Sequence, residues 1–201
     1  MHAHDDRSVL QNAATLAVIA DNAARLAGST RIHVGPVSLR PRFNPNATDP
    51  ASDVSSTDLP ADVDARQRDA FAAAWTALAV RSLATPGTDS AVTLFEDLGW
   101  KGLRVRDGGP EDAAFTSEPG EELPVSTVVR ALARATHVLP TASSDPESVD
   151  AVVLEGPEGR SALVVNLTDA PREVRLTGGL DTGFTVDPHD VVAVDLPGRA
   201  S

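Results

Sequence analysis

The sequence predicts an α/β protein in two parts, a run of β/α units followed by a small antiparallel β-module. Over residues 1–139, apolar patterns of helical and strand period alternate in the order helix, strand, helix, strand, helix, which is typical of parallel β/α units. Over residues 147–198 the period changes to two, and glycine-rich turns separate short runs. Two full strands are too few for a closed barrel or a covered open sheet, so we interpret the first part as the tail of a larger β/α protein.

The composition excludes several classes of function. The hydrophobic fraction of 41% is enough for a core, and the formal charge of −12 argues against nucleic acid or an anionic membrane as partner. The absence of cysteine excludes disulfides, thiolate metal sites and a cysteine nucleophile. Because the sequence starts without the apolar core of a signal peptide and has no run long enough to span a bilayer, we expect a soluble, cytoplasmic protein.

Three helices are expected in the first part, and each has a start signal. An S-x-x-Q capping box beginning at Ser8 opens the first helix, and Gly28 ends it. A D-x-x-Q signal at Asp64 opens the second, and Pro124 suits the first turn of a third helix that runs to about His137. We expect the second helix to turn one apolar face inward, at Phe71, Ala74, Trp75, Leu78 and Leu83.

Two strands are expected between these helices. The first alternates, with Ile32 and Val34 on one face and His33 on the other, and it ends before Pro36, which removes a donor from the ladder. The second covers residues 91–96, AVTLFE. In the β-module, after a linker, the expected strands are AVVLEG, SALVVNLTD, EVRLTG, GFTV and DVVAVDL.

Polar residues that follow these two strands form the strongest candidate site. If both strands belong to a β/α barrel, their C-terminal ends line the active-site face. Parallel neighbours lie about 4.8 Å apart, so groups at the two ends can converge on one ligand. The candidates are His33, Arg40, Arg42, Asn44 and Asn46 from the first strand and its loop, with Glu96 and Trp100 from the second.

Each candidate has an alternative interpretation that the sequence leaves open. Glu96 is either a functional carboxylate or an ordinary strand-end carboxylate paired with an arginine. Arg40 and Arg42 suit a carboxylate, a polyol or a developing oxyanion, but one of the two is better explained by salt bridges in an acidic protein. His33 is either a general base or a satisfied core residue, and we favour the second slightly. Trp100 either stacks on a sugar-like ring, as a substrate-binding residue, or plugs the rim of the barrel, and we favour the first.

Other motifs give weaker signals of a functional site. The sequence His2-x-His4, followed by two aspartates, has the composition of a metal site, but no later histidine pair supports it. We expect no metal and no cofactor. His189 and Asp190 suit a turn in the β-module. The sequence has no Gly-x-Ser-x-Gly elbow and no phosphate-binding loop, which disfavours a serine-triad esterase and a nucleotide enzyme.

Two segments, HVGPVSLRPRFNPNAT and AAWTALAVRSLATPGTDSAVTLFEDLGWKGL, resemble the D-apionate lactonase family. This bacterial family of carbohydrate catabolism has a glycosidase-like TIM barrel and a C-terminal β-sandwich. The resemblance implies that residues 1–139 are the C-terminal portion of a (β/α)8 TIM barrel, from the end of strand six to helix eight. Residues 147–198 are then the sandwich. It also implies a truncated form without roughly the first five and a half of the eight β/α units, whose activity on its own is open.

The resemblance implies hydrolysis of a small sugar lactone, D-apionolactone, to D-apionate; it leaves the oligomeric state open. Such a reaction needs a base to activate water, donors for the oxyanion and an acid for the leaving alkoxide. On this basis Glu96 is the base or nucleophile, and His33 a proton shuttle. The remaining residues bind substrate: Arg40 and Arg42 the oxyanion or product carboxylate, Asn44 and Asn46 the hydroxyls.

This sequence departs from the family pattern beside the expected site. Gly35 occupies a position where we expect serine, and Asp97-Leu98 a position where we expect two threonines. The substrate can therefore differ from that of the family.

Two other functions remain open. A glycoside hydrolase-like barrel fragment needs two carboxylates beside the bond, and only Glu96 is visible. The other alternative is a non-catalytic fragment in which only the β-module is stable.

Overall fold

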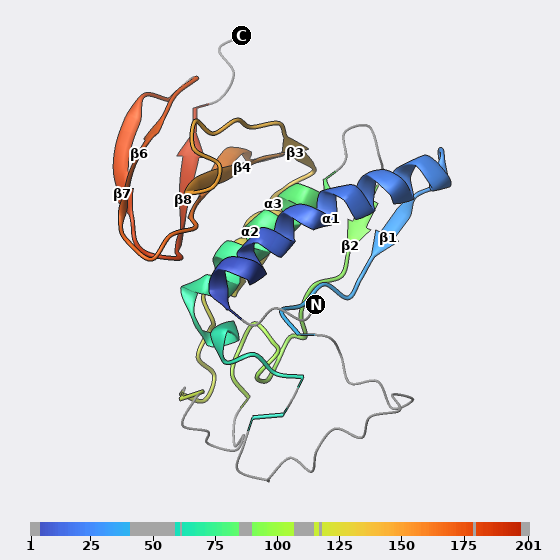
Figure 1. Ribbon diagram of the computed structural model, residues 1–201, viewed down its shortest axis with the longest axis vertical. Helices are drawn as coiled ribbons and strands as arrows, with labels where there is room; N and C mark the ends of the chain where they lie inside the picture. The colour runs from blue at the N-terminus through green and yellow to red at the C-terminus, as the bar shows by residue number, and fades with distance from the viewer. Residues whose placement is uncertain are drawn as a thin grey trace.

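The computed structural model describes residues 5–40, 59–60, 62–84, 90–106, 115–116, 118–178 and 180–197. The helices within them are α1 (Asp6–Ala27), the 3-10 helix η1 (Ala65–Arg68), α2 (Ala70–Leu83) and α3 (Val125–Arg134). The strands are β1 (Ile32–Val34), β2 (Ser90–Val92), β3 (His137–Leu139), β4 (Val149–Gly156), β5 (Gly159–Asn166), β6 (Arg172–Leu176), β7 (Thr182–Val186) and β8 (Val191–Leu196). The helices lie between the β1–β2 pair on one side and the β-module on the other (Figure 1).

The start of α1 differs from the predicted one. Asp5, not Ser8, caps the helix: its carboxylate accepts the backbone N–H of Ser8 at 2.9 Å. A carboxylate at this position satisfies a free N–H and also interacts favourably with the helix dipole, so the helix begins before the predicted box. The predicted end at Gly28 is confirmed, since the Gly28 N–H bonds to the carbonyl of Ala24 at 3.0 Å.

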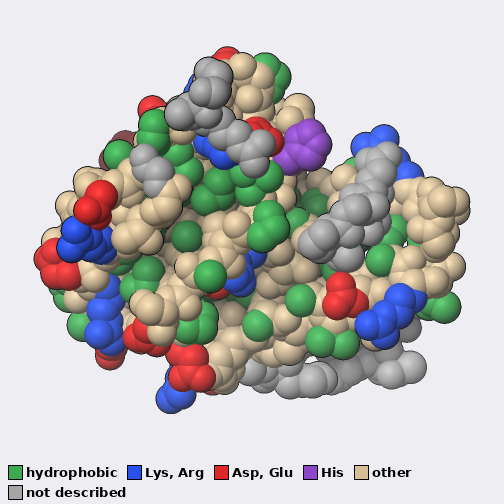
Figure 2. All heavy atoms as spheres, turned by 90° about the horizontal axis from the view of Figure 1, so that it is seen from above, with side chains coloured by type: hydrophobic (Ala, Val, Ile, Leu, Met, Phe, Trp, Pro, Cys, Tyr) green, Lys and Arg blue, Asp and Glu red, His purple; other side chains and the backbone are tan. Residues whose placement is uncertain are grey.

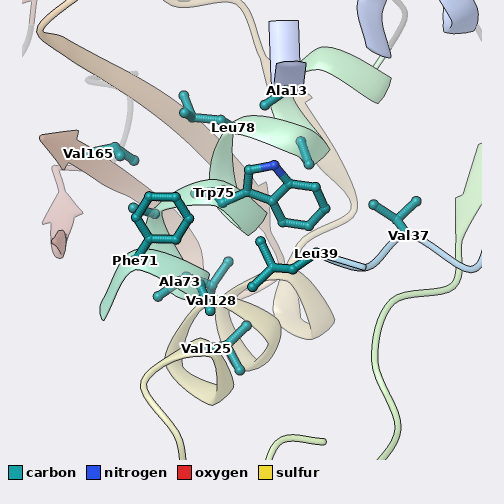
Figure 3. Close-up of a cluster of buried hydrophobic side chains, with 14 of the residues drawn as sticks. Ala13, Val37, Leu39, Phe71, Ala73, Trp75, Leu78, Val125, Val128 and Val165 are labelled. Atoms are coloured by element: carbon teal, nitrogen blue, oxygen red, sulfur yellow. The ribbon is translucent and has the colours of Figure 1, made fainter. Parts of the chain in front are cut away.

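The second helix is preceded by a separate turn. Asp64 caps the 3-10 helix η1 instead of α2, and Asp69 stands at the N-cap of α2 itself. The expected inner face of α2 is buried, but burial is not confined to one face, since residues 71–80 and Leu83 are all buried. A helix buried on all sides must be covered by two layers, and Figure 3 shows side chains of other elements gathered around Trp75.

The third helix ends earlier than predicted, at Arg134. The sequence pattern extended it to His137, but residues 137–139 form β3, which pairs antiparallel with β4. The Thr136 N–H bonds to the carbonyl of Glu155 at 2.8 Å. Cross-strand hydrogen bonds therefore replace the last helical turn, and β3 joins the first part of the chain to the sheet of the β-module.

Strands β1 and β2 pair in parallel, as predicted, with His33 opposite Ala91. β1 ends before Pro36, also as predicted. β2 ends at Val92, so the prediction of a strand to Glu96 is wrong, and Glu96 lies in the following loop. After the strands, the backbone of Thr93 donates to the carbonyl of Val34 and accepts from the N–H of Val37, both at 2.9 Å. These irregular hydrogen bonds hold the segments that follow β1 and β2 together where the regular ladder stops.

The five predicted strands of the β-module are confirmed by β4 to β8. β3, β4, β5 and β8 form one antiparallel sheet in that order, and β6 and β7 form a hairpin. One face of the sheet packs on the hairpin through Ala162, Val164 and Val186. The opposite face joins the large core around α2, with the buried side chains Val152, Leu154, Leu163 and Val165. Alternate residues of β4 and β5 thus serve two cores.

Described residues include no closed barrel, because the parallel sheet in them has two strands. In this part of the chain no helix combines the length and apolar character that a membrane span requires. On the face shown in Figure 2, basic and acidic side chains lie beside one another. Several surface ion pairs have this character, among them Arg175–Asp181 and Arg130–Glu122.

Candidate functional site

A hydroxyl–imidazole pair lies at the C-terminal ends of the parallel strands. The Nε2 atom of His33 lies 2.7 Å from Oγ1 of Thr93, and both residues are exposed. Their neighbours Val34 and Val92 pack against the core instead. The alternation of the strands therefore puts His33 and Thr93 on the face of the sheet away from the helices. His33 was predicted from the sequence and Thr93 was not, although Thr93 follows Ala91 at strand spacing and so shares its face.

Glu96 lies in a loop closed by its own backbone. Its N–H donates to the carbonyl of Lys101 at 3.3 Å, and Oε1 lies 3.7 Å from Nζ of Lys101. The same ammonium is 2.6 Å from Oδ2 of Asp62. The carboxylate of Glu96 is 43% exposed, whereas that of Asp62 is 21% exposed. Glu96 therefore sits beside a positive charge and stays open to solvent. Lys101 could have been noticed in the sequence because it is the single lysine there.

Arg40 follows a segment that is anchored in the core. Val37 and Leu39 are buried members of the core that also contains Trp75, and Figure 3 labels all three. The Nε of Arg40 donates to Oδ2 of Asp64 at 3.1 Å. This contact matches the salt-bridge interpretation that the sequence left open for one arginine of the pair.

Asp64 is the centre of this charged network. Arg66 donates to its carboxylate through Nε and Nη2, both at 2.8 Å, and reaches Asp6 through Nη1 at 2.7 Å. Burial alone raises the pKa of Asp64, but the hydrogen bonds from Arg66 and the charges of Arg66 and Arg40 outweigh it, and the net pKa lies below the ordinary value. The network fixes η1 against the start of α1.

Trp100 is half-buried, and its ring lies 6.2 Å from that of Phe115 at a tilt of 36°. Whether it also contacts a ligand stays a prediction. Five residues considered from the sequence for substrate or metal binding lie outside the described residues: Arg42, Asn44, Asn46, His2 and His4.

The predicted turn at His189 and Asp190 is confirmed. His189 has a positive φ of 51° between β7 and β8, and its ring packs edge-on against Phe71 at 5.7 Å. In the ranges that the structure describes, no three residues among His, Asp and Glu are placed to hold a metal ion.

A cavity of about 730 Å³ lies away from the strand ends. It separates α1 and α2 from loops of the β-module, and Leu10, Arg81, Asp150 and His189 are among its lining residues. None of the described candidates at the strand ends lines it. The Arg81–Asp150 ion pair, 2.8 Å long, crosses from α2 to β4 at this cavity.

Comparison with models of known protein families shows to which family the chain belongs. The family model "D-apionate lactonase, TIM barrel domain" matches residues 1–137, and "D-apionate lactonase, C-terminal immunoglobulin-like domain" matches residues 146–198. The chain belongs to the D-apionate lactonase family. The β-module is thus the immunoglobulin-like domain of this family. Searches of curated proteins and of solved structures gave no match.

Gly35, at a position where we expect serine from the sequence, lies directly against Thr93. A Cβ atom at Gly35 would lie 2.7 Å from Cβ of Thr93 and 3.1 Å from its carbonyl oxygen. A serine there would push the two strand ends apart. The glycine therefore makes room for Thr93, and the two positions depend on each other.

Proposed function

We propose that the chain is a carbohydrate lactone hydrolase that converts D-apionolactone to D-apionate. The observation that carries this proposal is the match to both domains of one lactonase family across most of the sequence. Exposed polar groups at the ends of two parallel strands support it, because active sites of TIM barrels lie at that end.

Lactone hydrolysis assigns a role to each group. Glu96, exposed and beside Lys101, is the base that activates water. Arg40, whose Nε also bonds to Asp64, and Arg42 bind the oxyanion or the product carboxylate. Asn44 and Asn46 hold substrate hydroxyls, and Trp100 lies at the ligand face. These are proposals, drawn from the family resemblance and the exposed position of Glu96.

We further propose that residues 1–139 correspond to the last units of the barrel and residues 147–198 to the C-terminal domain. A complete barrel has eight parallel strands, and the described residues contain two that pair in parallel. The full pocket then includes groups from other strands. For this reason a family member with all eight barrel strands is the reference in the lactone hydrolysis assay.

Replacement of Glu96 tests the proposal. In Glu96→Gln the amide cannot take a proton, so we expect hydrolysis of D-apionolactone to fall by about 10²- to 10⁴-fold. Acid release is followed by NMR, with the wild-type chain and the full-length reference in parallel. Glu158→Gln is the matched control, because Glu158 is exposed in the turn between β4 and β5.

Unchanged turnover in Glu96→Gln would remove Glu96 from the chemistry. A reference that hydrolyses the lactone beside an inactive wild-type chain would show that this chain alone does not carry the activity.

A glycoside hydrolase is the second candidate, favoured by one observation. The carboxylates of Asp62 and Glu96 approach the same ammonium, and glycosidases use two carboxylates. The short contact of Asp62 with Lys101 suits a fixed acceptor better than a proton-donating acid, which is why we prefer the lactonase. Release of p-nitrophenol from aryl glycosides, without lactone hydrolysis, would reverse this preference.

A further inference from the structure

We propose that Thr93 is the nucleophile of the reaction and His33 its base, an inference that rests on the proposed lactone hydrolysis. The diagnostic geometry is a nucleophile within hydrogen-bond reach of a base. Oγ1 of Thr93 lies 2.7 Å from Nε2 of His33, at the end of the strands where a barrel enzyme binds its substrate. Both residues are exposed, so a small ester can reach the hydroxyl.

A second histidine–threonine pair, His137 and Thr136, differs from the pair of His33 and Thr93 in how its hydroxyl is bonded. Oγ1 of Thr136 lies 3.0 Å from Nδ1 of His137, but it also lies 3.2 Å from the carbonyl oxygen of Glu155, to which it donates. The hydroxyl proton of Thr136 is therefore already engaged in a hydrogen bond to the backbone. Within the described residues, the hydroxyl of Thr93 has no hydrogen-bond partner other than His33. Thr93 can therefore donate its proton to the imidazole.

The backbone around Thr93 holds the hydroxyl in place. Its N–H and carbonyl bond to Val34 and Val37, and the missing side chain of Gly35 leaves room for its Cβ. A nucleophile fixed in this way loses little entropy when the substrate arrives. The pair is thus built by two segments far apart in the sequence and is held from both sides.

Every bond and proton of the proposed reaction is accounted for by the chain, the lactone and water. Nε2 of His33 takes the hydroxyl proton while Oγ1 of Thr93 attacks the lactone carbonyl carbon. The ring C–O bond then breaks, and the imidazolium gives its proton to the ring oxygen, which becomes a hydroxyl. Water, activated by Glu96, attacks the threonine ester. The bond to Oγ1 breaks, and the proton held by Glu96 returns to Thr93. The net change is lactone plus water to hydroxy acid.

A fluorophosphonate probe tests the nucleophile without relying on sugar recognition. The full chain is incubated with the probe, digested, and mapped by mass spectrometry. We expect the adduct on Thr93 in the wild type and in Thr93→Ser. We expect it to be lost in Thr93→Val, which keeps the shape of the side chain, and in His33→Gln. The matched controls are His137→Gln and Thr185→Ala; Thr185 donates to Glu173 at 2.6 Å across the β6–β7 hairpin. Far-UV circular dichroism checks that each variant is folded.

Absence of an adduct on folded wild-type protein, or equal labelling in His33→Gln, would overturn the inference. Turnover separates it from the proposed function. We expect lactone hydrolysis to fall by about 10²- to 10⁴-fold in Thr93→Val and to be retained in Thr93→Ser. If Thr93→Val hydrolyses the lactone like the wild type, the nucleophile is wrong and the lactonase stands. If Thr93 is labelled through His33 but no lactone is hydrolysed, the nucleophile stands and the substrate class is wrong.

Discussion

Asp64 and Asp150 are buried carboxylates whose surroundings act in opposite directions. Asp64 is 6% exposed and Asp150 5% exposed. Hydrogen bonds and two arginines overcome the burial of Asp64 and lower its pKa. Burial raises the pKa of Asp150, although the N–H of Ala151 and the guanidinium of Arg81 act the other way. Two similar side chains therefore make different contributions to stability.

This difference predicts opposite dependence on pH. A lowered folded-state pKa means that Asp64 contributes stability above its unfolded pKa, and that this is lost as pH falls through the folded pKa. A raised folded-state pKa means that the contribution of Asp150 to stability is present at low pH. That contribution is lost as pH rises through the folded-state pKa. We expect Asp64→Asn to cost about 2 kcal/mol at pH 7 by leaving two guanidiniums short of their partner.

Asp150→Asn is the matched comparison. It keeps an acceptor for Ala151 and removes a disfavoured charge, so we expect little loss at pH 7. Urea unfolding of both variants at pH 7 and pH 4 measures the effect. A larger loss for Asp150→Asn than for Asp64→Asn at pH 7 would contradict the assignment.

At the scale of elements, the end of β4 is fitted against the end of α3. A Cβ atom at Gly156 would collide with the carbonyl oxygen of Arg134. Next to it, the Thr136 N–H bonds to Glu155. Backbone meets backbone here, so neither side can yield by changing a rotamer. This contact joins the β/α part of the chain to the immunoglobulin-like domain.

We expect Gly156→Ala to destabilise the protein by about 2 kcal/mol, because the added methyl forces β4 away from α3. Gly183→Ala is the control, since a Cβ there would meet only the carbonyl oxygen of Val174 at 3.6 Å. Thermal unfolding of both variants measures the difference. Equal midpoints would show that the contact between β4 and α3 relaxes without cost.

At the scale of the whole molecule, α2 packs against both the β/α part of the chain and the immunoglobulin-like domain. Its buried residues share one core with α1 and with the inner face of β4 and β5. Removal of either layer would expose apolar surface on α2. The two parts should therefore unfold together, in contrast to the alternative in which only the β-module is stable.

A single tryptophan reporter tests this. Trp75 is 1% exposed in α2, and Trp100 is the other tryptophan of the sequence. In Trp100→Phe, we expect the fluorescence of Trp75 and the far-UV circular dichroism to change at the same urea concentration. A dichroism signal that persists after Trp75 has become exposed would support an independently stable β-module.

Much of this organisation could be predicted from local pattern. Helical and strand periods located the helices, the parallel pair and the strands of the β-module, because periodicity reports which face is buried. The predicted ends were less accurate. Asp5 replaced Ser8 as a cap, β2 stopped before Glu96, and His137 entered a strand. The cap at Asp5 is a local choice between two nearby residues, whereas the strand at His137 depends on β4, a partner that the local pattern does not contain.

The sequence by itself determined the order of the elements, the family and the class of residues at the strand ends. Only the tertiary structure decided which polar groups meet. His33 pairs with Thr93 across 60 positions, and Arg40 with Asp64 across 24. Such pairs depend on strand register and on room left by residues such as Gly35, which composition and spacing do not encode. Hydrogen bonds act over about 3 Å, so contacts of this kind are settled when distant segments pack together.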